Sequence, residues 1–287
     1  MPDGDALPPA VRAFDQTAPR FDERFGEWRS VAAQRAAVRR YLLRTFRPGS
    51  RILELGAGTG DDALFLLERG YHVFPTDGSP GMVERATEKV RRAGQTDVPV
   101  EQVVLEELDR FERRRRQERL PPFDGAFSNF AAFNCVPDLR RVARPLAGLI
   151  RPGGACVLVV FGPCSIGEVI VELVRGRPAA AVRRFRRGPA PARIGQEHFQ
   201  VWYPRPVAFA RAFDPYFALK RVRGIGILVP PSAAEPWISK FPRVVAAMEA
   251  ADRLLSAPLA RLADHVLLHL ERSHVTAPPA GSPDTSI

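Results

Sequence analysis

RILELGAGTG, residues 51–60, is a short apolar strand pattern that runs straight into alternating glycines. Residues 61–70, DDALFLLERG, continue with a helical pattern that Gly70 closes. A strand that stops at a glycine loop and reverses into a helix is the opening unit of nucleotide-binding α/β folds. Glycines let the backbone pass close to a ligand, and the helix N-terminus behind them offers unpaired N–H groups to an anion. We therefore expect a ligand site at this loop.

The segment after Gly70 supports this interpretation. Val73 and Phe74 are typical of a second strand, and Asp77 stands at its end. Ser79 suits the N-cap of the next helix, and Pro80 suits its first position, where a missing N–H costs nothing. An acidic residue about 20 residues beyond the glycines suits a ribose, whose hydroxyls need an acceptor pair.

These motifs resemble the class I S-adenosylmethionine-dependent methyltransferases, of the type that acts on small molecules. Two later segments extend the resemblance: residues 123–139 are similar to the family's fourth strand and following loop, and residues 146–162 to its helix, Pro-Gly-Gly turn and fifth strand. The match covers residues 35–162. It implies a Rossmann-like α/β fold: a seven-stranded, mostly parallel sheet whose last strand is antiparallel, with helices on both faces and a cap inserted after strand five.

The resemblance also implies S-adenosylmethionine as cofactor. By position, the glycine loop with Glu54 would hold the methionine part and Asp77 the ribose. Many relatives carry an acidic residue at the end of the third strand, where this chain has Val104 or Leu105. Either Glu106 takes this role with a shifted register, or a backbone carbonyl does. The implied cofactor-binding residues are Glu54, Gly56, Ala57, Gly58, Gly60, Asp77, Gly78, Ser79, Met82, Glu106, Asn129 and Phe130.

The reaction implied is attack of a nucleophile on a sulfonium methyl group. Because that methyl group is already activated, we expect alignment and water exclusion rather than a fixed catalytic constellation. A hydroxyl or acidic carbon would need a base, for which His198 and Tyr203 are the candidates by type and location. The predicted pocket-lining residues are Phe21, Phe133, Asn134 and Trp202.

The chain is divided here into three parts. Residues 1–34 form an N-terminal segment with aromatic residues at helical spacing, which in the resembled family often lies over the cofactor as a lid. Residues 35–272 form the methyltransferase domain, including a cap insertion at 164–204. Residues 273–287 are rich in Pro, Ser, Gly and Thr and are predicted to be disordered.

Composition limits the function classes. No signal peptide, membrane helix, cysteine pair or metal-ligand cluster stands out, so we expect a cytoplasmic protein without a metal. The net charge of +10 is nearly all arginine, and nucleic acid is not a favoured partner. Arg113–Arg116 stand between Glu112 and Glu118 and are predicted to form a solvated helix face. The one-sided stretch from Arg175 to Arg193 suits an acidic substrate or an anionic membrane surface.

Four functions remain to be weighed. The first is methyl transfer to a small or medium organic acceptor on O, N or C. The second is methylation of RNA, and the third is partner binding by a non-catalytic protein of the same fold. The fourth is nicotinamide-dependent oxidoreduction, which fits poorly because Asp61 stands where the dinucleotide fingerprint needs its third glycine. Acceptor, methylated atom and oligomeric state are left open.

Overall fold

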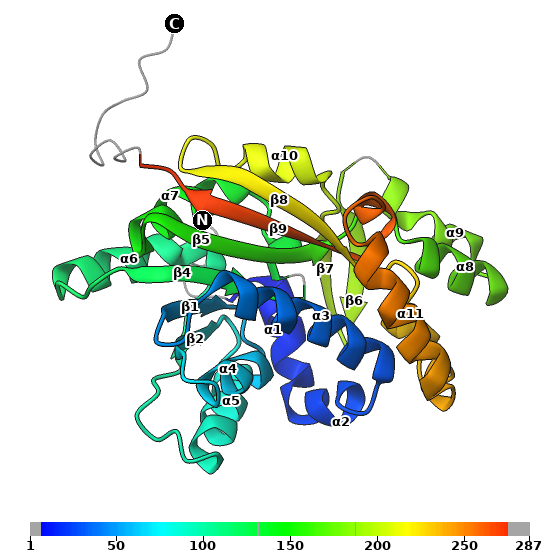
Figure 1. Cartoon of the computed structure of the whole chain (residues 1–287), viewed down its shortest axis with the longest axis horizontal. Coiled ribbons are helices and arrows are strands. Elements are labelled where there is room, and N and C mark those ends of the chain that lie inside the picture. The colour runs from blue at the N-terminus through cyan, green and yellow to red at the C-terminus, as the bar shows by residue number, and fades with distance from the viewer. Residues whose placement is uncertain (1–6, 131, 187, 275–287) are drawn as a thin grey trace, which may run out of the picture.

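A seven-stranded sheet forms the centre of the computed structural model, which describes residues 7–130, 132–186 and 188–274 (Figure 1). Six strands run in the same direction, and the last strand in sequence, β9, pairs antiparallel with both of its neighbours. In spatial order the strands are β3 (Glu101–Gln102), β2 (His72–Asp77), β1 (Arg51–Leu55), β4 (Phe123–Ser128), β5 (Ile150–Phe161), β9 (His265–Arg272) and β8 (Phe217–Ile225). The predicted fold class is confirmed.

Helices cover both faces of the sheet, each with its own apolar core. Phe111, Val142 and Phe209 pack on one face, and Leu42 and Leu66 on the other. Covering both faces is what buried parallel strands require. The helices of the first face are α6 (Leu108–Gln117), α7 (Leu139–Leu149) and α10 (Pro206–Arg211); those of the second are α3 (Arg29–Thr45), α4 (Asp61–Leu67) and α5 (Pro80–Arg92).

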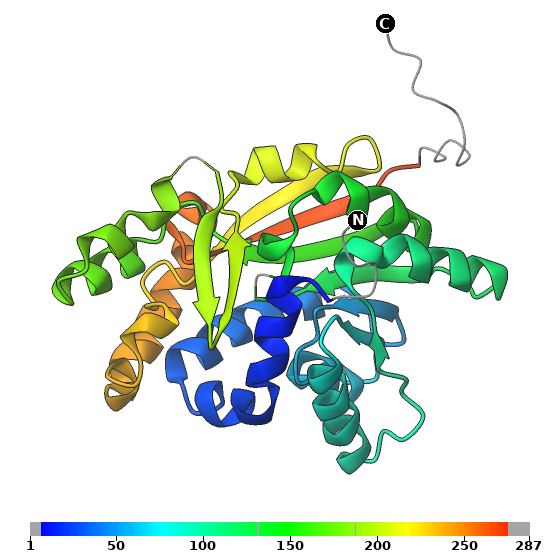
Figure 2. The ribbon, with the colours of Figure 1, turned by 180° about the vertical axis from the view of Figure 1, so that it is seen from behind.

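The remaining elements gather at one edge of the sheet. A β-hairpin descends beside the N-terminal helices (Figure 2), while three helices project at the side (Figure 1). The hairpin is β6 (Ala190–Ile194) and β7 (Glu197–Val201); the N-terminal helices are α1 (Pro9–Thr17) and α2 (Phe21–Phe25); the projecting helices are α8 (Ile166–Val174), α9 (Pro178–Ala181) and α11 (Pro242–Leu255). None of the described helices is long and apolar enough to cross a bilayer.

The order of the strands positions the site. The chain turns outward from β1 in both directions, to β2 on one side and to β4 on the other. At such a switch point the loops after adjacent strands diverge and leave a crevice at the carboxyl edge of the sheet, where ligands of these folds bind. A cavity of about 540 Å³ lined by Arg51, His72 and Phe123 lies at the opposite edge, where β1, β2 and β4 begin.

Several local predictions differ from the structure. The predicted boundary between residues 34 and 35 lies inside α3, and residues 1–6 and 275–287, which the predicted lid segment and tail include, lie outside the described residues. Within the predicted cap insertion, residues 190–194 form strand β6, which pairs with β7 along its whole length. Arg115 is not solvated as predicted. It is 9% exposed, and its guanidinium lies 4.3 Å from the centre of the Phe123 ring.

Candidate functional site

The glycine loop between β1 and α4 is built on three left-handed residues: Gly56, Gly58 and Gly60 have φ values of +70°, +56° and +83°. A Cβ on Gly56 would come within 2.6 Å of the Ala132 Cβ, and one on Gly60 within 3.0 Å of the Ala86 Cβ. A Cβ on Gly58 would meet no atom within 4 Å. Two glycines are therefore needed for packing, whereas Gly58 faces open space into which a ligand fits.

Asp77, the last residue of β2, lies beside this loop. Its Oδ2 accepts a hydrogen bond of 2.8 Å from the Gly58 N–H, and its Oδ1 accepts one of 2.9 Å from the Ser79 N–H. Burial raises the pKa of the Asp77 carboxyl, and these two N–H groups oppose the shift. The predicted ribose-binding carboxylate is thus placed at the loop, next to Gly58.

Glu54 is 2% exposed near the end of β1. Burial, and then the charge of Asp62, raise the pKa of its carboxyl well above the usual value. Its Oε2 has no hydrogen-bond partner in the described part of the chain. A buried acceptor without a partner is costly, so its position needs an explanation outside folding. An ammonium group would satisfy it, and the predicted cofactor carries one in its methionine part. The open space at Gly58 and the orphaned oxygen of Glu54 both fit S-adenosylmethionine.

Charged side chains from α3 surround the start of α4. Arg39 Nε lies 2.6 Å from Asp62 Oδ1, and Arg35 pairs with Asp61. Asn129, just after β4, donates from Nδ2 to Asp62 Oδ2 at 2.7 Å. The predicted cofactor residue Asn129 is therefore fixed against the helix that follows the glycine loop.

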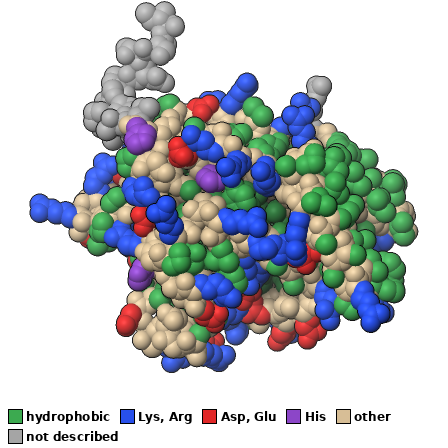
Figure 3. All heavy atoms as spheres, viewed as in Figure 1, with side chains coloured by type: hydrophobic (Ala, Val, Ile, Leu, Met, Phe, Trp, Pro, Cys, Tyr) green, Lys and Arg blue, Asp and Glu red, His purple; other side chains and the backbone are tan. Residues whose placement is uncertain are grey.

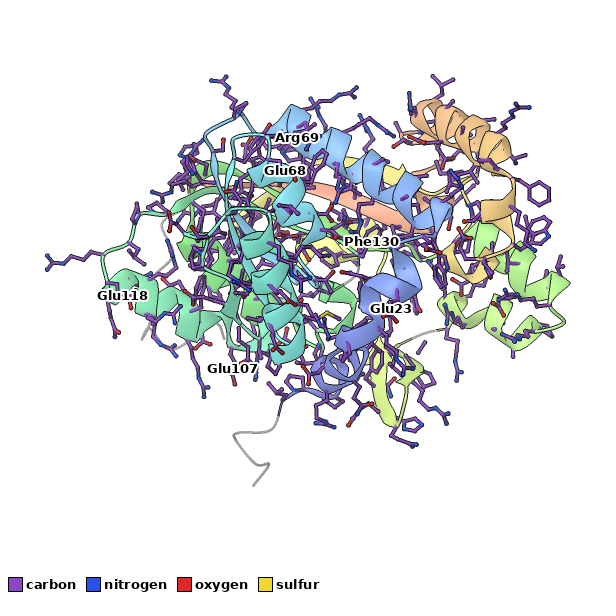
Figure 4. The ribbon with its side chains drawn as sticks, turned by 90° about the horizontal axis from the view of Figure 1, so that it is seen from below. Glu23, Glu68, Arg69, Glu107, Glu118 and Phe130 are labelled. Carbon is purple, nitrogen blue, oxygen red and sulfur yellow. The ribbon has the colours of Figure 1, made fainter. Side chains whose placement is uncertain are left out.

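Phe130 follows with φ +55°, a left-handed conformation that is unusual for an aromatic residue. Its N–H donates to the side chain of Asn129 at 3.0 Å, which helps to hold this turn. The ring lies next to α3 (Figure 4): the Arg35 guanidinium is 5.3 Å from the ring centre. On another side the ring meets His265 edge to face at 5.4 Å. Strained residues of this kind cluster at functional sites.

The residues predicted for the adenine side of the site contact neighbouring parts of the protein. Ser79 caps α5 by accepting from the Met82 N–H at 3.0 Å, which confirms the predicted N-cap. Met82 is buried, and a Cβ on Gly78 would come within 3.0 Å of the Val11 side chain of α1. Glu106 is exposed, in a 3-10 turn after a β3 strand of only two residues. The Ala57 N–H donates to the Thr76 carbonyl at 2.9 Å, so this loop residue acts through its backbone.

Two aspartates join the N-terminal helices to this site. Asp15 of α1 accepts from the Ser79 hydroxyl and the Gly81 N–H, both at 2.7 Å. Asp22 of α2 accepts from the Thr59 hydroxyl at 2.6 Å. From the sequence, the aromatic residues of this N-terminal segment were predicted to lie over the cofactor. In the structure the carboxylates make the polar contacts with the glycine loop and with α5.

Two predicted pocket residues have other roles. Phe133 is 1% exposed and packs against Phe209 and Phe213 in the core, so the prediction that it lines a pocket is wrong. Asn134 is equally buried, and both polar atoms of its side chain bond to the backbone. Nδ2 donates to the Trp202 carbonyl at 2.5 Å, and Oδ1 accepts from the Phe161 N–H at 2.8 Å. Asn134 therefore ties the cap to β5 instead of facing a ligand.

The other candidates are spread over the cap and the N-terminal segment. His198 is exposed on the hairpin opposite Arg193, so it does not suit a buried base. Tyr203 is half-buried, with its ring 5.9 Å from Phe161 and under the Arg184 guanidinium. Burial raises the pKa of the Tyr203 hydroxyl, although Arg183 and Arg184 act in the opposite direction. Phe21 pairs with Phe25 at 4.7 Å, and Trp202 is half-buried.

The structure adds residues to this edge of the sheet that sequence reasoning missed. Phe161 ends β5, and His265 begins β9 with its ring stacked on Phe161 at 4.9 Å. Together with Phe130 they form a cluster of rings beside the predicted cofactor site. The available signal was the pair Asp264-His265 immediately before an apolar strand. The strand order is needed to recognise this pair as part of the site, because residue 265 is far from the glycine loop in the sequence.

Comparison with known proteins agrees with this geometry. The sequence family described as "Methyltransferase domain" matches residues 53–156. The S-adenosyl-L-methionine-dependent Diels-Alderase iccD of Talaromyces variabilis is 36% identical over 117 residues, which are 39% of this chain and 36% of that protein. The demethylmenaquinone methyltransferase of Clavibacter sepedonicus is 35% identical over 133 residues, 44% of this chain and 45% of that protein. The chain thus spans less than half the length of these curated relatives.

A solved structure shows the same fold. The S-adenosylmethionine-dependent methyltransferase from Mesorhizobium loti superposes with a TM-score of 0.50 at 20% identity, over 84% of this chain and 98% of that one. Residues 53–156 are thus similar to a methyltransferase domain, and the strand order and overall fold are those of class I methyltransferase structures.

Proposed function

We propose that this chain transfers the methyl group of S-adenosylmethionine to an oxygen, nitrogen or carbon atom of a small or medium-sized organic acceptor. The observation that carries the proposal is the cluster of rings at the carboxyl edge of the sheet: Phe130, Phe161, Tyr203 and His265. The cluster begins at Phe130, the residue after Asn129, which contacts the helix of the glycine loop. Flat apolar rings favour an aromatic or lipid-like acceptor.

The cofactor would be held by the predicted residues. Glu54 offers an unpaired carboxylate oxygen to an ammonium group, Asp77 offers acceptors to the ribose, and Gly58 leaves room for close approach. When bound, the cofactor supplies an electrophilic methyl carbon. The chain's own contribution is then to orient the acceptor and to exclude water from the reacting atoms.

Helix α1 and the hairpin cover the carboxyl edge of the sheet, and this cover favours a small acceptor over RNA. Helix α1 packs on the hairpin through Ala10, Ala13 and Phe199, and Arg12 pairs with Glu197 at 2.9 Å. The same helix is bonded to the start of α5 through Asp15. A strand of nucleic acid would have to displace this cover, which favours a small molecule as the acceptor.

A second candidate is favoured by the comparison with the Diels-Alderase of Talaromyces variabilis. The name of that protein states dependence on the same cofactor and a cycloaddition. Binding of S-adenosylmethionine is therefore not enough to establish methyl transfer in this chain. The decisive readout is formation of S-adenosylhomocysteine together with a methylated acceptor.

The first experiment is calorimetric titration with S-adenosylmethionine, S-adenosylhomocysteine and NAD. The Asp77→Ala variant is compared with Asp97→Ala, since Asp97 is an exposed aspartate near the opposite edge of the sheet. We expect micromolar binding of both sulfur compounds, weaker by at least about tenfold in Asp77→Ala only. Binding of NAD alone would overturn the assignment of the site.

The second experiment follows the methyl group. Methyl-labelled S-adenosylmethionine is incubated with phenols, quinols, amines and a mixed RNA preparation, and transfer is measured for each. Label in a small acceptor supports the proposal. Label in RNA alone would establish the RNA methyltransferase, and cofactor binding without transfer to any acceptor would favour a cycloaddition or a binding role.

The projecting helices also support a proposed contact with an anionic membrane surface. In Figure 3 hydrophobic side chains gather over α8, α9 and α11, with basic side chains around them. Residues 163–195 contain seven arginines and only two acidic residues, Glu168 and Glu172, which are both buried. An apolar surface with basic residues around it is the pattern that binds anionic lipid. The exposed apolar side chains of this region include Ile170, Leu173, Val174, Phe185, Trp237 and Phe241.

Sedimentation with lipid vesicles tests this contact. We expect binding to vesicles containing phosphatidylglycerol, weak binding to pure phosphatidylcholine, and loss of binding with added salt. Leu173→Glu with Val174→Glu should abolish it. Leu120→Glu, a change at an exposed apolar residue between α6 and β4, is the control. Equal binding to both kinds of vesicle, or none, would refute the contact.

A further inference from the structure

His265 is a buried histidine at the edge of the sheet where the ring cluster lies. It is the first residue of β9, and because β9 is antiparallel to β5, His265 lies opposite Phe161 at the carboxyl end of β5. The residue is 5% exposed. Its ring stacks on Phe161 and meets the edge of Phe130. The imidazole is thus held between two rings of the proposed acceptor site.

The neighbours of His265 determine which ring nitrogen carries the proton. Nδ1 lies 3.0 Å from Gln34 Oε1 and 3.3 Å from Asp264 Oδ2. The Gln34 amide nitrogen points to the Pro230 carbonyl and to Asp264, which leaves its oxygen to accept. Both neighbours of Nδ1 are acceptors, so the neutral imidazole carries its hydrogen on Nδ1. The lone pair of Nε2 is then free.

The Nε2 atom has no partner. It is buried, and no described residue makes a hydrogen bond to it. An unpaired nitrogen in such a place is costly unless another molecule provides a donor. The pairing of one ring nitrogen with a carboxylate while the other keeps a free lone pair is the arrangement used by general bases.

Charged groups of the cap fix the partner carboxylate. Arg184, 6% exposed, donates to Asp264 Oδ1 at 2.7 Å and also pairs with Glu168 of α8. Burial alone would raise the pKa of the Asp264 carboxyl, but His265 and Arg184 lower it well below the usual value. The other charged or titratable groups on this side are Tyr203 under Arg184, and Arg35 over Phe130. Asp264 therefore stays ionised beside the imidazole.

We propose that His265 is the general base of this protein, positioned by Asp264 and Gln34, and that the acceptor is a compound that must lose a proton as it is methylated: a phenol or enol hydroxyl, or an acidic carbon. This inference rests on the proposed function and names its substrate class. His265 replaces His198, which is exposed, as the candidate histidine.

The acceptor's X–H bond breaks, and its proton moves to Nε2 of His265, which becomes an imidazolium facing the carboxylate of Asp264. A lone pair on X forms the bond to the methyl carbon. The carbon–sulfur bond of the cofactor breaks with its electron pair left on sulfur, giving S-adenosylhomocysteine. The imidazolium then returns its proton to solvent.

The first test needs no turnover. Protein labelled with 15N-histidine is examined by NMR across a pH series, without and with S-adenosylhomocysteine. We expect His265 in its neutral form to be protonated on Nδ1, with Nε2 unprotonated. In Asp264→Asn this preference should be reduced. A proton on Nε2 in the wild-type protein would overturn the inference, whether or not the protein transfers methyl groups.

The second test uses 2-naphthol as a flat aromatic hydroxyl probe, titrated into the complex with S-adenosylhomocysteine. We expect naphthol binding to weaken about tenfold when the NMR signals show His265 as an imidazolium, because the imidazolium cannot accept the hydroxyl. His265→Gln should remove this pH dependence. The matched control is His269→Gln on the same strand, where Nδ1 contacts the Tyr41 hydroxyl at 2.9 Å.

The outcomes separate the two proposals. Absence of naphthol binding to the wild-type complex, or the same pH dependence in His265→Gln, would overturn the role of His265. Methyl transfer to a small acceptor would still support the proposed function in that case. Conversely, His265 with the expected tautomer and pH-dependent binding, in a protein that transfers no methyl group, would overturn the proposed function.

Discussion

The carboxylate of Asp22 accepts a 2.6 Å hydrogen bond from the hydroxyl of Thr59, which joins helix α2 to the glycine loop. The ammonium group of Lys89 lies 2.7 Å from the same carboxylate and 3.1 Å from the Thr59 hydroxyl. Three segments of the chain, α2, the loop and α5, therefore meet in one polar cluster. The N-terminal helices are fixed to the proposed cofactor site by charge as well as by apolar packing.

Replacing Asp22 tests this connection. We expect Asp22→Ala to speed dissociation of S-adenosylhomocysteine about three- to tenfold, because α2 loses its bonds to Thr59 and Lys89. Stopped-flow displacement measures the rate. Glu23→Ala, at the next residue of α2 (Figure 4), controls for loss of an exposed acidic side chain. An unchanged dissociation rate in Asp22→Ala would show that the cluster does not retain the ligand.

Gly58 should be needed for binding more than for folding. In Gly58→Ala the new Cβ meets no protein atom but occupies the proposed cofactor space, so we expect binding of S-adenosylhomocysteine to weaken more than about tenfold. The left-handed backbone alone should cost about 1 kcal/mol of stability. Gly70→Ala carries the same backbone strain away from the site, at φ +79° with nothing near its Cβ. Calorimetry and thermal unfolding of both variants separate the two effects, and equal binding by both would contradict the assignment.

Glu54 should oppose folding near neutral pH. The pKa of the Glu54 carboxyl is higher in the folded protein than in the unfolded chain, where it is about 4.3. The folded protein is therefore most stable with respect to this group below about pH 4.3, and it loses stability as the pH rises toward the pKa of the folded state. We expect Glu54→Gln to stabilise the free protein by about 1–3 kcal/mol near pH 7, with the gain disappearing toward pH 4. Urea unfolding at several pH values measures this.

The same variant should bind the cofactor less well. Loss of the carboxylate removes the partner proposed for the ammonium group, so S-adenosylmethionine binding should weaken by at least about tenfold. Glu118→Gln, at an exposed residue just after α6 (Figure 4), should change neither stability nor binding. A Glu54→Gln protein that is less stable and binds normally would assign Glu54 to the fold alone.

Asn134 should matter for stability through the cap. Asn134→Ala leaves the Phe161 N–H and the Trp202 carbonyl without their side-chain partner, which should cost about 2–4 kcal/mol. Denaturant unfolding measures the loss. Asn129→Ala, which also removes a buried amide, should reduce S-adenosylhomocysteine binding more strongly than Asn134→Ala does. The reverse order would return Asn134 to the ligand site.

The part of the site that the sequence predicts is the part made by neighbours in the chain. The left-handed glycines, the cap at Ser79 and the position of Asp77 each depend on a few adjacent residues, so local rules were sufficient. Residues whose role depends on packing were assigned wrongly. Phe133 and Asn134 follow a strand at the ligand edge, yet the first turns into the core and the second bonds to the cap.

The base candidate illustrates the same limit. His198 stands in a strand-like segment of the cap, and no local signal shows that its side of the hairpin faces outward. His265 reaches the ligand edge only because β9 inserts antiparallel between β5 and β8. The arginine-rich stretch was predicted as a surface, but Arg184 is buried between Glu168 and Asp264, which are far apart in the sequence. Charge counts do not reveal such pairing.

Helix α1 has contacts on two sides: Asp15 joins it to the start of α5, and Arg12 joins it to the hairpin at Glu197. One helix therefore contacts the segments beside both proposed sites, the one for the cofactor and the one for the acceptor. Moving it away from either would expose both. Exchange of spent cofactor and departure of methylated product would then be a single mechanical event, and the slowest movement of α1 would set the pace for each.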